Sequence, residues 1–259
     1  MRIALAQTIG TPADVAANLR LLEDFASRAA AAGARLLVLP ELFLTGYNIG
    51  ADVAPLAEPS NGPSAKAIAT IAERHGLAIA YGYAELAGEA VYNTVALIDR
   101  DGRLLASYRK IHLWGDVERG TFRAGSACEP FTFEGSRFGL AICFDVEFPE
   151  FARSLALAGT EVLLVISATS APYSVVPCHV VPARAYENAM FVLFCNRTGE
   201  ERGLAYAGQS CVAAPDGGIL GASDRTEALV LADLVPEEYA EYRRTHRYID
   251  DRRPELYRS

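Results

Sequence analysis

The sequence predicts a single layered domain of the α/β or α+β class. The chain opens with a strand, a helix and a second strand, which is typical of a parallel pair. Three strand-like runs then follow one another with short turns, which is typical of antiparallel neighbours. No linker, repeat or change of composition divides the 259 residues, so we expect one domain in which helices cover the sheets.

The first third of the chain supplies the parallel unit. Residues 3–7 form a short apolar strand, and residues 11–14 give a turn and a helix start. Apolar residues at helical spacing continue as far as Gly33, and residues 35–39 form a fully apolar strand. After a loop rich in Gly, Pro and Asn, a second helix is expected over residues 64–75.

The later elements follow from the same patterns. Strands are expected over 77–85, 91–99 and 103–108, joined by turns that contain glycine. Strands then alternate with helices, and the expected elements are strands over 137–143, 161–167, 191–196 and 228–233, helices over 147–158 and 180–189, and a hairpin of 210–214 with 220–222. A charged, Tyr-rich tail covers residues 236–259, and we expect it to take part in oligomer contacts.

Composition and charge exclude several classes of protein. Hydrophobic residues make up 51% of the chain and charged residues 22%, which excludes a disordered or collagen-like protein. A net charge of -8 argues against a partner that is a nucleic acid or an anionic membrane. The longest apolar runs, 36–39 and 162–166, are far shorter than the roughly 20 residues of a membrane helix. Because the first residues lack the pattern of a secretory signal, a cytoplasmic location is expected. The negative net charge favours a small-molecule partner.

The cysteines do not suggest a structural framework. There are five, which is an odd number, and they are widely spaced without a CxxC pair. With only four histidines in the chain, neither a disulfide framework nor a zinc site is expected.

Cys143 is the first candidate for chemistry. An apolar strand ends at this residue and a helix begins within a few residues, so the thiol should lie on a strand-to-helix turn. Such a turn holds a nucleophile close to unpaired backbone N–H groups. The alternative is a buried cysteine that only packs, since free cysteine usually behaves as a small hydrophobic residue.

Three charged residues are further candidates. Glu41 follows the apolar strand over 35–39, and ligands of α/β sheets gather beyond the carboxyl ends of strands. Partial burial there would raise its pKa and make it a proton shuttle. Lys110 lies just past another strand, and Glu118 follows eight residues later. Each also has an ordinary explanation as a solvated surface charge.

Together these residues belong to ordered motifs. The motifs are Leu39-Pro40-Glu41 with Thr45-Gly46-Tyr47, Tyr108-Arg109-Lys110 with His112-Leu113, Glu118 seven residues before Gly125, Ile142-Cys143-Phe144-Asp145 with Phe148-Pro149-Glu150, and Arg184-Ala185-Tyr186-Glu187-Asn188. This pattern resembles the nitrilase superfamily of carbon-nitrogen hydrolases from Arg2 to about Asp233. The resemblance implies a four-layer αββα sandwich, one hydrolase domain over residues 1–259, no cofactor or metal, and a homodimer or higher homo-oligomer.

The resemblance also implies roles for the candidate residues. Cys143 would attack a carboxamide carbon after Glu41 removes its proton, giving a thioester intermediate. The Lys110 ammonium and the backbone N–H of Phe144 would stabilise the oxyanion. Glu118 would orient substrate or water and hold Lys110 in place.

Three segments resemble a subgroup, the bacterial ω-amino amidases typified by 5-aminopentanamidase. The segments are 43–50, 79–83 and 143–150. We therefore expect Tyr47 and Glu147 to bind substrate, with Glu147 and the pair Glu200-Glu201 reaching a protonated amine at its distal end. The alternative for Glu147 is a helix-starting acid that never touches substrate.

The candidate residues also fit other functions. The same Glu, Lys and Cys residues would also serve a nitrilase or an N-carbamoyl amine hydrolase. Nitrilases proper usually carry Trp after the cysteine, where this chain has Phe144, and this difference favours an amide. A Cys-His pairing through His112 is disfavoured because the pattern places the base at Glu41. A non-catalytic binding or assembly protein on this fold would have no need of all three residues.

Overall fold

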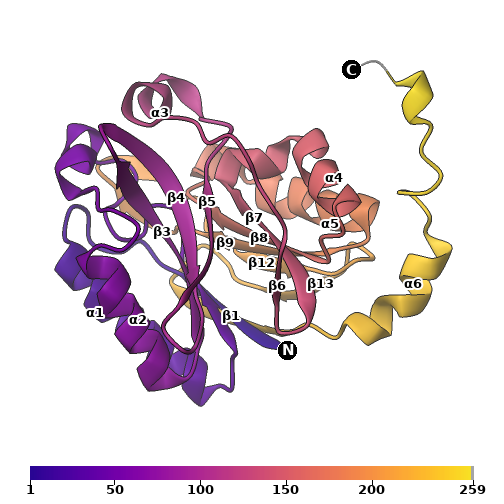
Figure 1. Cartoon of the computed structure of the whole chain (residues 1–259), viewed down its shortest axis with the longest axis horizontal. Coiled ribbons are helices and arrows are strands. Elements are labelled where there is room, and N and C mark those ends of the chain that lie inside the picture. The colour runs from indigo at the N-terminus through magenta and orange to yellow at the C-terminus, as the bar shows by residue number, and fades with distance from the viewer. Residues whose placement is uncertain (258–259) are drawn as a thin grey trace.

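The computed structural model describes residues 1–257 and contains two six-stranded sheets that pack face to face between helices (Figure 1). The first sheet has the order β14-β1-β2-β3-β4-β5 and is formed by β1 (Arg2–Gln7), β2 (Leu36–Val38), β3 (Ala78–Ala87), β4 (Ala90–Ile98), β5 (Leu104–Arg109) and β14 (Ala228–Asp233). The second sheet has the order β13-β12-β9-β8-β7-β6 and is formed by β6 (Phe131–Phe133), β7 (Ser136–Ile142), β8 (Val162–Ser167), β9 (Phe191–Asn196), β12 (Cys211–Ala213) and β13 (Ile219–Ala222).

Helices form the two outer layers. The α-helices are α1 (Val15–Ala31), α2 (Pro63–His75), α3 (Gly115–Thr121), α4 (Pro149–Leu157), α5 (Val181–Asn188) and α6 (Ala240–Thr245). Figure 1 shows α1 and α2 against the first sheet and α4 and α5 against the second. This is the αββα sandwich that the resemblance implied, in a single domain.

The predicted strand pairings are confirmed. β1 and β2 are parallel, and β3, β4 and β5 are antiparallel neighbours. β12 and β13 form the predicted hairpin, with Cys211 opposite Ala222. The pattern did not predict that β14 returns to pair antiparallel with β1, where Leu5 lies opposite Val230. This pairing brings the chain from beyond the second sheet back to the edge of the first.

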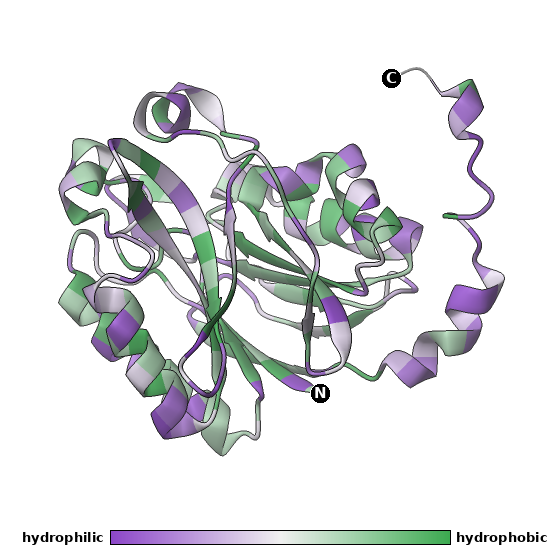
Figure 2. Ribbon diagram, viewed as in Figure 1, coloured by the Kyte–Doolittle hydropathy of each residue, from purple (hydrophilic) through white to green (hydrophobic). Residues whose placement is uncertain are grey.

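The core between the sheets explains why the central strands are apolar throughout. Along β1, Ile3 and Leu5 belong to the cluster between the sheets, whereas Ala4 and Ala6 face the helices. Both faces of such a strand are covered, so no polar alternation remains. Figure 2 shows the strands mainly in the colour of hydrophobic residues. Across the interface Cys195 Sγ donates to the carbonyl of Val38 at 3.2 Å.

Some elements differ from the predicted ones. The short helix α3 was not predicted, because glycine stands at both Gly115 and Gly120 and breaks the helical pattern. The helix expected over 147–158 begins only at Pro149, because residues 143–147 form a separate 3₁₀ turn. The helix expected over 180–189 is α5, preceded by a π turn over 176–180.

The tail contains a 3₁₀ turn over 236–239, then α6, and contacts the body of the domain through several side chains. Arg243 Nε donates to the carbonyl of Ala189 at 3.1 Å, and Tyr248 OH donates to Tyr186 OH at 2.9 Å. Its role in oligomer contacts stays a prediction. Among the helices of residues 1–257, none combines the length and the apolar character needed to cross a membrane.

Candidate active site

The candidate residues meet at one edge of the sandwich. β1, β2 and β3 are parallel, and two antiparallel steps give β5 the same direction, so Glu41 and Lys110 both lie beyond carboxyl ends of the first sheet. Cys143 directly follows β7 of the second sheet. The loop of Glu41 crosses β3 at Gly82, where a Cβ atom would lie only 2.5 Å from the main-chain nitrogen of Leu42. Glycine at this position therefore allows the loop its close approach.

Lys110 lies between two carboxylates. Its Nζ atom is 2.7 Å from Glu41 Oε1 and 2.7 Å from Glu118 Oε1. Lys110 and Glu41 are 0% exposed and Glu118 is 2% exposed. Asn93 Nδ2 also donates to Glu41 Oε1 at 2.7 Å. The other oxygen of this carboxylate, Glu41 Oε2, has no hydrogen-bond partner among the described residues and is free to accept a proton.

Burial and charge act in opposite directions on this cluster. Burial alone would lower the pKa of Lys110, but the charges of Glu41 and Glu118 outweigh it and raise the pKa. Burial raises the pKa of Glu41, and the neighbouring ammonium only partly opposes this. Lys110 therefore stays an ammonium, while Glu41 is more easily protonated than an ordinary carboxylate.

Glu118 is held from three sides. Besides Lys110, Tyr47 OH donates to Glu118 Oε1 at 2.6 Å and the main-chain N–H of Trp114 donates to Glu118 Oε2 at 2.9 Å. Because Glu118 lies on α3, this short helix fixes the second carboxylate against the lysine. The contact between Glu118 and Lys110 agrees with the holding role that the resemblance implied, and the ordinary explanation of Glu118 as a surface residue is wrong.

Cys143 occupies a strained turn that a buried carboxylate stabilises. Its φ of 47° is left-handed, a conformation that costs a non-glycine residue about 1–3 kcal/mol. Asp145 accepts from the main-chain N–H of Ile142 at 2.9 Å and from Tyr108 OH at 2.8 Å. It also lies 2.8 Å from Nδ1 of His112 and accepts from the N–H of the same residue. His112 is therefore paired with Asp145, and this agrees with a structural role.

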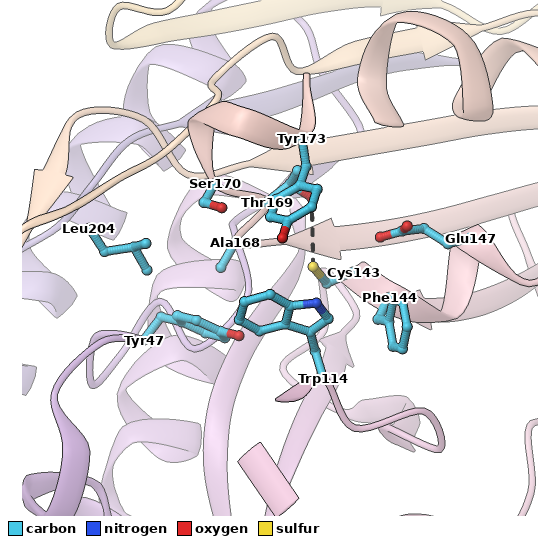
Figure 3. Close-up of a pocket in the computed structure, with 10 residues that line it drawn as sticks. All are labelled: Tyr47, Trp114, Cys143, Phe144, Glu147, Ala168, Thr169, Ser170, Tyr173 and Leu204. Atoms are coloured by element: carbon cyan, nitrogen blue, oxygen red, sulfur yellow. Dashed lines mark hydrogen bonds between the residues drawn. The ribbon is translucent and has the colours of Figure 1, made fainter. Parts of the chain in front are cut away.

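The Cys143 thiol opens into a cavity of about 150 Å³. The residues that line it are Tyr47, Trp114, Cys143, Phe144, Glu147, Ala168, Thr169, Ser170, Tyr173 and Leu204 (Figure 3). Burial and then the charge of Glu41 raise the pKa of Cys143, so the resting thiol is protonated. The N–H of Phe144 lies in the first turn of a 3₁₀ helix, where N–H groups lack partners within the helix.

The wall of this cavity combines aromatic rings with one carboxylate. Trp114 and Tyr173 contact edge to face, with ring centroids 6.1 Å apart. Glu147 is the only carboxylate among the described residues of the lining, and Figure 3 shows its carboxylate pointing toward Cys143. Its main-chain carbonyl accepts from Arg184 Nη2 at 2.9 Å, which fixes the segment that carries it. Burial raises the pKa of Glu147.

The prediction that Glu201 reaches a substrate amine is wrong. Glu201 is 1% exposed, and its Oε2 atom accepts from the main-chain N–H of Tyr47 at 3.0 Å and from Tyr206 OH at 2.5 Å. It also lies 3.8 Å from Arg197. Its carboxylate is therefore occupied by the loop that carries Tyr47. Glu200 is exposed in the short strand β10 (Glu200–Glu201), which pairs with β11 (Leu204–Ala205).

Arg197 was missed by the sequence patterns. It follows β9 and is 0% exposed, and it donates from Nε to the carbonyl of Glu41 at 2.9 Å and from Nη2 to the carbonyl of Leu42 at 2.6 Å. A third bond goes to the carbonyl of Ile9. An arginine of the second sheet therefore holds the main chain of the loop that presents Glu41 from the first. A group of three His, Cys, Asp or Glu side chains suited to a metal ion does not occur within residues 1–257.

Comparison with known proteins gives consistent matches along the chain. A family model described as carbon-nitrogen hydrolase matches residues 2–244. A protein of Pseudomonas protegens described as a hydrolase in the pqqF 5' region is 47% identical, over 99% of this chain and 90% of its own length. An (R)-stereoselective amidase from Pseudomonas sp. is 36% identical, over 98% of this chain and 92% of its own length.

The same family is found among solved structures. The crystal structure of an amidase from Nesterenkonia sp. superposes with a TM-score of 0.86 at 34% identity, covering 99% of this chain and 94% of that chain. One variant of that amidase shows Michael addition of acrylamide at the active-site cysteine. Another variant, in which a cysteine is replaced by alanine, is in complex with butyramide. The chain therefore belongs to the carbon-nitrogen hydrolase family, as the resemblance to the nitrilase superfamily implied, and is a hydrolase that uses an active-site cysteine as nucleophile.

Proposed function

We propose that this protein hydrolyses small aliphatic carboxamides to carboxylate and ammonia, with Cys143 as the nucleophile. One observation carries the proposal. The thiol of Cys143, on a left-handed turn, interacts with the charges of a buried cluster in which Lys110 is fixed by two carboxylates and Glu41 keeps one oxygen free. Glu41 is close enough for its charge to raise the pKa of Cys143. Acid, base and cation are thus in place before substrate enters.

The first half of the reaction forms a thioester. The Cys143 proton moves to Glu41 Oε2, and the sulfur attacks the carbonyl carbon of the amide. Negative charge collects on the substrate oxygen, where the Lys110 ammonium and the Phe144 N–H donate to it. Both donors are fixed by the fold, so they need no rearrangement at the moment when the charge appears.

The second half returns the enzyme to its resting state. Glu41 gives the proton to the departing nitrogen, which leaves as ammonia. Water then enters, loses a proton to Glu41 and attacks the thioester carbon, and the sulfur leaves and recovers the proton. Glu118 keeps Lys110 directed at the oxyanion throughout both halves.

The nucleophile is tested by Cys143→Ala. We expect turnover to be lost while the thermal unfolding midpoint stays near that of wild type, because Cys143 contributes the covalent route and little packing. Mass spectrometry after a rapid quench should find an acyl adduct on Cys143. An adduct on Cys128, Cys178, Cys195 or Cys211, or turnover in the Ala variant, would remove Cys143 from this role. Ammonia release from amides, nitriles and N-carbamoyl amines, measured in parallel, separates the amidase from its two alternatives.

We further propose that the preferred substrate is an ω-amino amide such as 5-aminopentanamide. Glu147 is the carboxylate of the cavity lining, and a protonated amine at the distal end of the substrate is its natural complement. An ammonium close to Glu147 would also offset the burial that raises the pKa of this group. The (R)-stereoselective amidase among the relatives, and butyramide in the related structure, support a small amide in the same cavity.

Amine recognition is tested by comparing 5-aminopentanamide with pentanamide. In wild type we expect the amino amide to have the higher kcat/KM by about 1.5 to 3 kcal/mol, the value of a hydrogen bond to a charged group. Glu147→Gln should remove most of this preference and leave the pentanamide rate unchanged. Equal rates for both amides in wild type would instead identify a general aliphatic amidase.

A further inference from the structure

The Cys143 thiol has a polar neighbour that the proposed mechanism does not use. Thr169 Oγ1 lies 3.6 Å from Cys143 Sγ, and Ser167 Oγ lies 2.8 Å from Thr169 Oγ1. Both hydroxyl residues are buried at the end of β8, beside the end of β7 that carries Cys143. Three polar atoms therefore form a short chain that ends on the sulfur. Figure 3 shows its last link, between Thr169 and Cys143.

The hydroxyl groups of Ser167 and Thr169 can supply one hydrogen bond to the sulfur. The two hydroxyls share one hydrogen bond, which uses one of their two hydrogens. Either atom of the Thr169–Cys143 pair can donate while the thiol keeps its hydrogen, but a thiolate can only accept, so in that state the second hydrogen is donated by Thr169 to Cys143 Sγ. The N–H of Thr169 already donates to Ser167 Oγ at 3.1 Å and to Asn196 Oδ1 at 2.9 Å. This favours the direction from Ser167 to Thr169 to sulfur, because the serine oxygen then accepts once and donates once.

We propose that Thr169 is a further catalytic residue, whose hydroxyl donates to the Cys143 sulfur and stabilises the thiolate while Ser167 orients it. The proposal rests on the proposed role of Cys143 as nucleophile. In the attack step the thiol proton goes to Glu41 Oε2, and Thr169 keeps its own proton. The hydrogen bond strengthens as the sulfur becomes negative, weakens in the neutral thioester, and strengthens again when the sulfur leaves. Thr169 therefore acts on both halves of the reaction.

The thiolate needs such a donor because its surroundings are otherwise unfavourable. Burial raises the pKa of Cys143, and so do the carboxylates Glu41 and Glu118, while Lys110 opposes them. Ser167, at the start of the hydroxyl chain, acts in the opposite direction and lowers this pKa. Burial, and then the charges of Glu41 and Glu118, raise the pKa of Tyr47, which stays neutral. With these groups unchanged between variants, a difference in thiol reactivity reports the hydroxyl alone.

The experiment measures the rate at which iodoacetamide alkylates Cys143 as a function of pH. Mass spectrometry assigns the adduct to Cys143 rather than to the exposed Cys178. Thr169→Val keeps the shape of the side chain and removes the donor, while Thr169→Ser keeps the donor and is the matched control. We expect the Val variant to react about 10- to 100-fold more slowly at neutral pH, with its midpoint moved to higher pH. The alkylation rate and the pH midpoint of the Ser variant should stay close to those of wild type.

Turnover gives an independent readout. In the Val variant kcat should fall by a similar factor while KM changes little, because the hydrogen bond to sulfur strengthens in the attack step and not on substrate binding. Ser167→Ala should have a smaller effect on both measurements, since the Thr169 hydroxyl remains. If Thr169→Val does not fold, Thr169→Ala removes the same donor with less crowding.

Alkylation of both Thr169→Val and Thr169→Ala at the wild-type rate, with wild-type pH dependence, would show that Thr169 is only part of the cavity wall. That outcome leaves the proposed function intact as long as Cys143→Ala and Glu41→Gln are inactive. Turnover by Cys143→Ala would instead overturn the proposed function itself, whatever the Thr169 variants do.

Discussion

The two sheets contribute different kinds of residue to the two halves of the site. The half beyond the first sheet holds the charges Glu41, Lys110 and Glu118, which are buried and bonded to one another. The half beyond the second sheet holds the neutral thiol of Cys143, the hydroxyl of Thr169 and most of the cavity wall. Neither Glu41 nor Lys110 is part of the lining of the cavity. Substrate thus meets the nucleophile and Glu147 directly, and the three charges of the first half only where the two halves join.

This division allows the site to have both buried charges and an open substrate pocket, which conflict when one surface must provide both. Charges act most strongly where water is absent, but an open pocket admits water. The first half keeps its charges dry by satisfying them with each other and with Asn93 and Tyr47. The second half can then be open and shaped for the substrate without weakening the field at the reacting carbon.

The largest effect on stability and turnover should come from removing the Lys110 cation from the first half of the site. Lys110→Met removes the cation from between two buried carboxylates, which typically costs about 3–5 kcal/mol of folding free energy. It also removes a fixed oxyanion donor, so we expect kcat to fall about 10²-fold or more. Thermal unfolding and steady-state kinetics measure the two effects. Lys110→Met with Glu41→Gln should recover part of the stability and none of the turnover; an unchanged kcat in the single variant would place Lys110 outside the reaction.

Breaking the turn of the nucleophile half should cost less. Asp145→Asn keeps the shape of the side chain but replaces one accepting oxygen by a donor, although all its partners at Ile142, Tyr108 and His112 require acceptors or a charge. We expect a loss of about 1–3 kcal/mol in unfolding free energy, the usual cost of leaving a buried polar group unsatisfied. Denaturant unfolding of Asp145→Asn beside wild type provides the measurement. Equal stability of the two proteins would mean that Asp145 does not support the turn.

The smallest expected effect is on the pH profile of kcat/KM, which distinguishes the role of Glu41 in the first half of the site from that of Glu147 in the second. Burial raises the pKa of Glu41 above its ordinary value of 4.5, and below that raised pKa the carboxyl is protonated and cannot accept the thiol proton. Activity should therefore fall as the pH drops through a midpoint above 4.5 in kcat/KM for pentanamide, which reports the free enzyme. Because the uncharged substrate makes no use of Glu147, Glu147→Gln should leave this midpoint in place. A midpoint at or below 4.5 would argue against Glu41 as the base.

The sequence predicted the functional residues that directly follow a strand. Glu41, Lys110 and Cys143 each follow an apolar run, and parallel strand ends meet in space, so their positions could be inferred before their contacts were known. The β-α-β start and the antiparallel run were predictable for the same reason, since their periodicity is local. Glu118 was identified only through its motif, because nothing in the pattern around it indicates that α3 turns it inward.

Other site residues depend on contacts that no local pattern contains. Arg197 looks like a solvated charge after a strand, but its carbonyl acceptor on Glu41 is 156 residues away in the chain. Glu201 looked free to reach a substrate, yet the main-chain N–H groups that occupy it belong to the loop of Tyr47 and Asn48. Thr169 gains its meaning only from the distance to Cys143 across two neighbouring strands. In each case the hydrogen-bond partner of the residue can be identified only once the fold is known.

Arg197 makes the enzyme's activity a sensitive measure of how firmly the two sheets are joined. It arises from one sheet and fixes the main chain of a loop in the other, so Glu41 and Cys143 keep their spacing only while the sandwich stays closed. A slip of one ångström between the sheets would leave every strand intact and every helix folded. It would still separate base from nucleophile, and rates fall steeply with such displacements. Turnover should thus disappear at milder denaturing conditions than the secondary structure does.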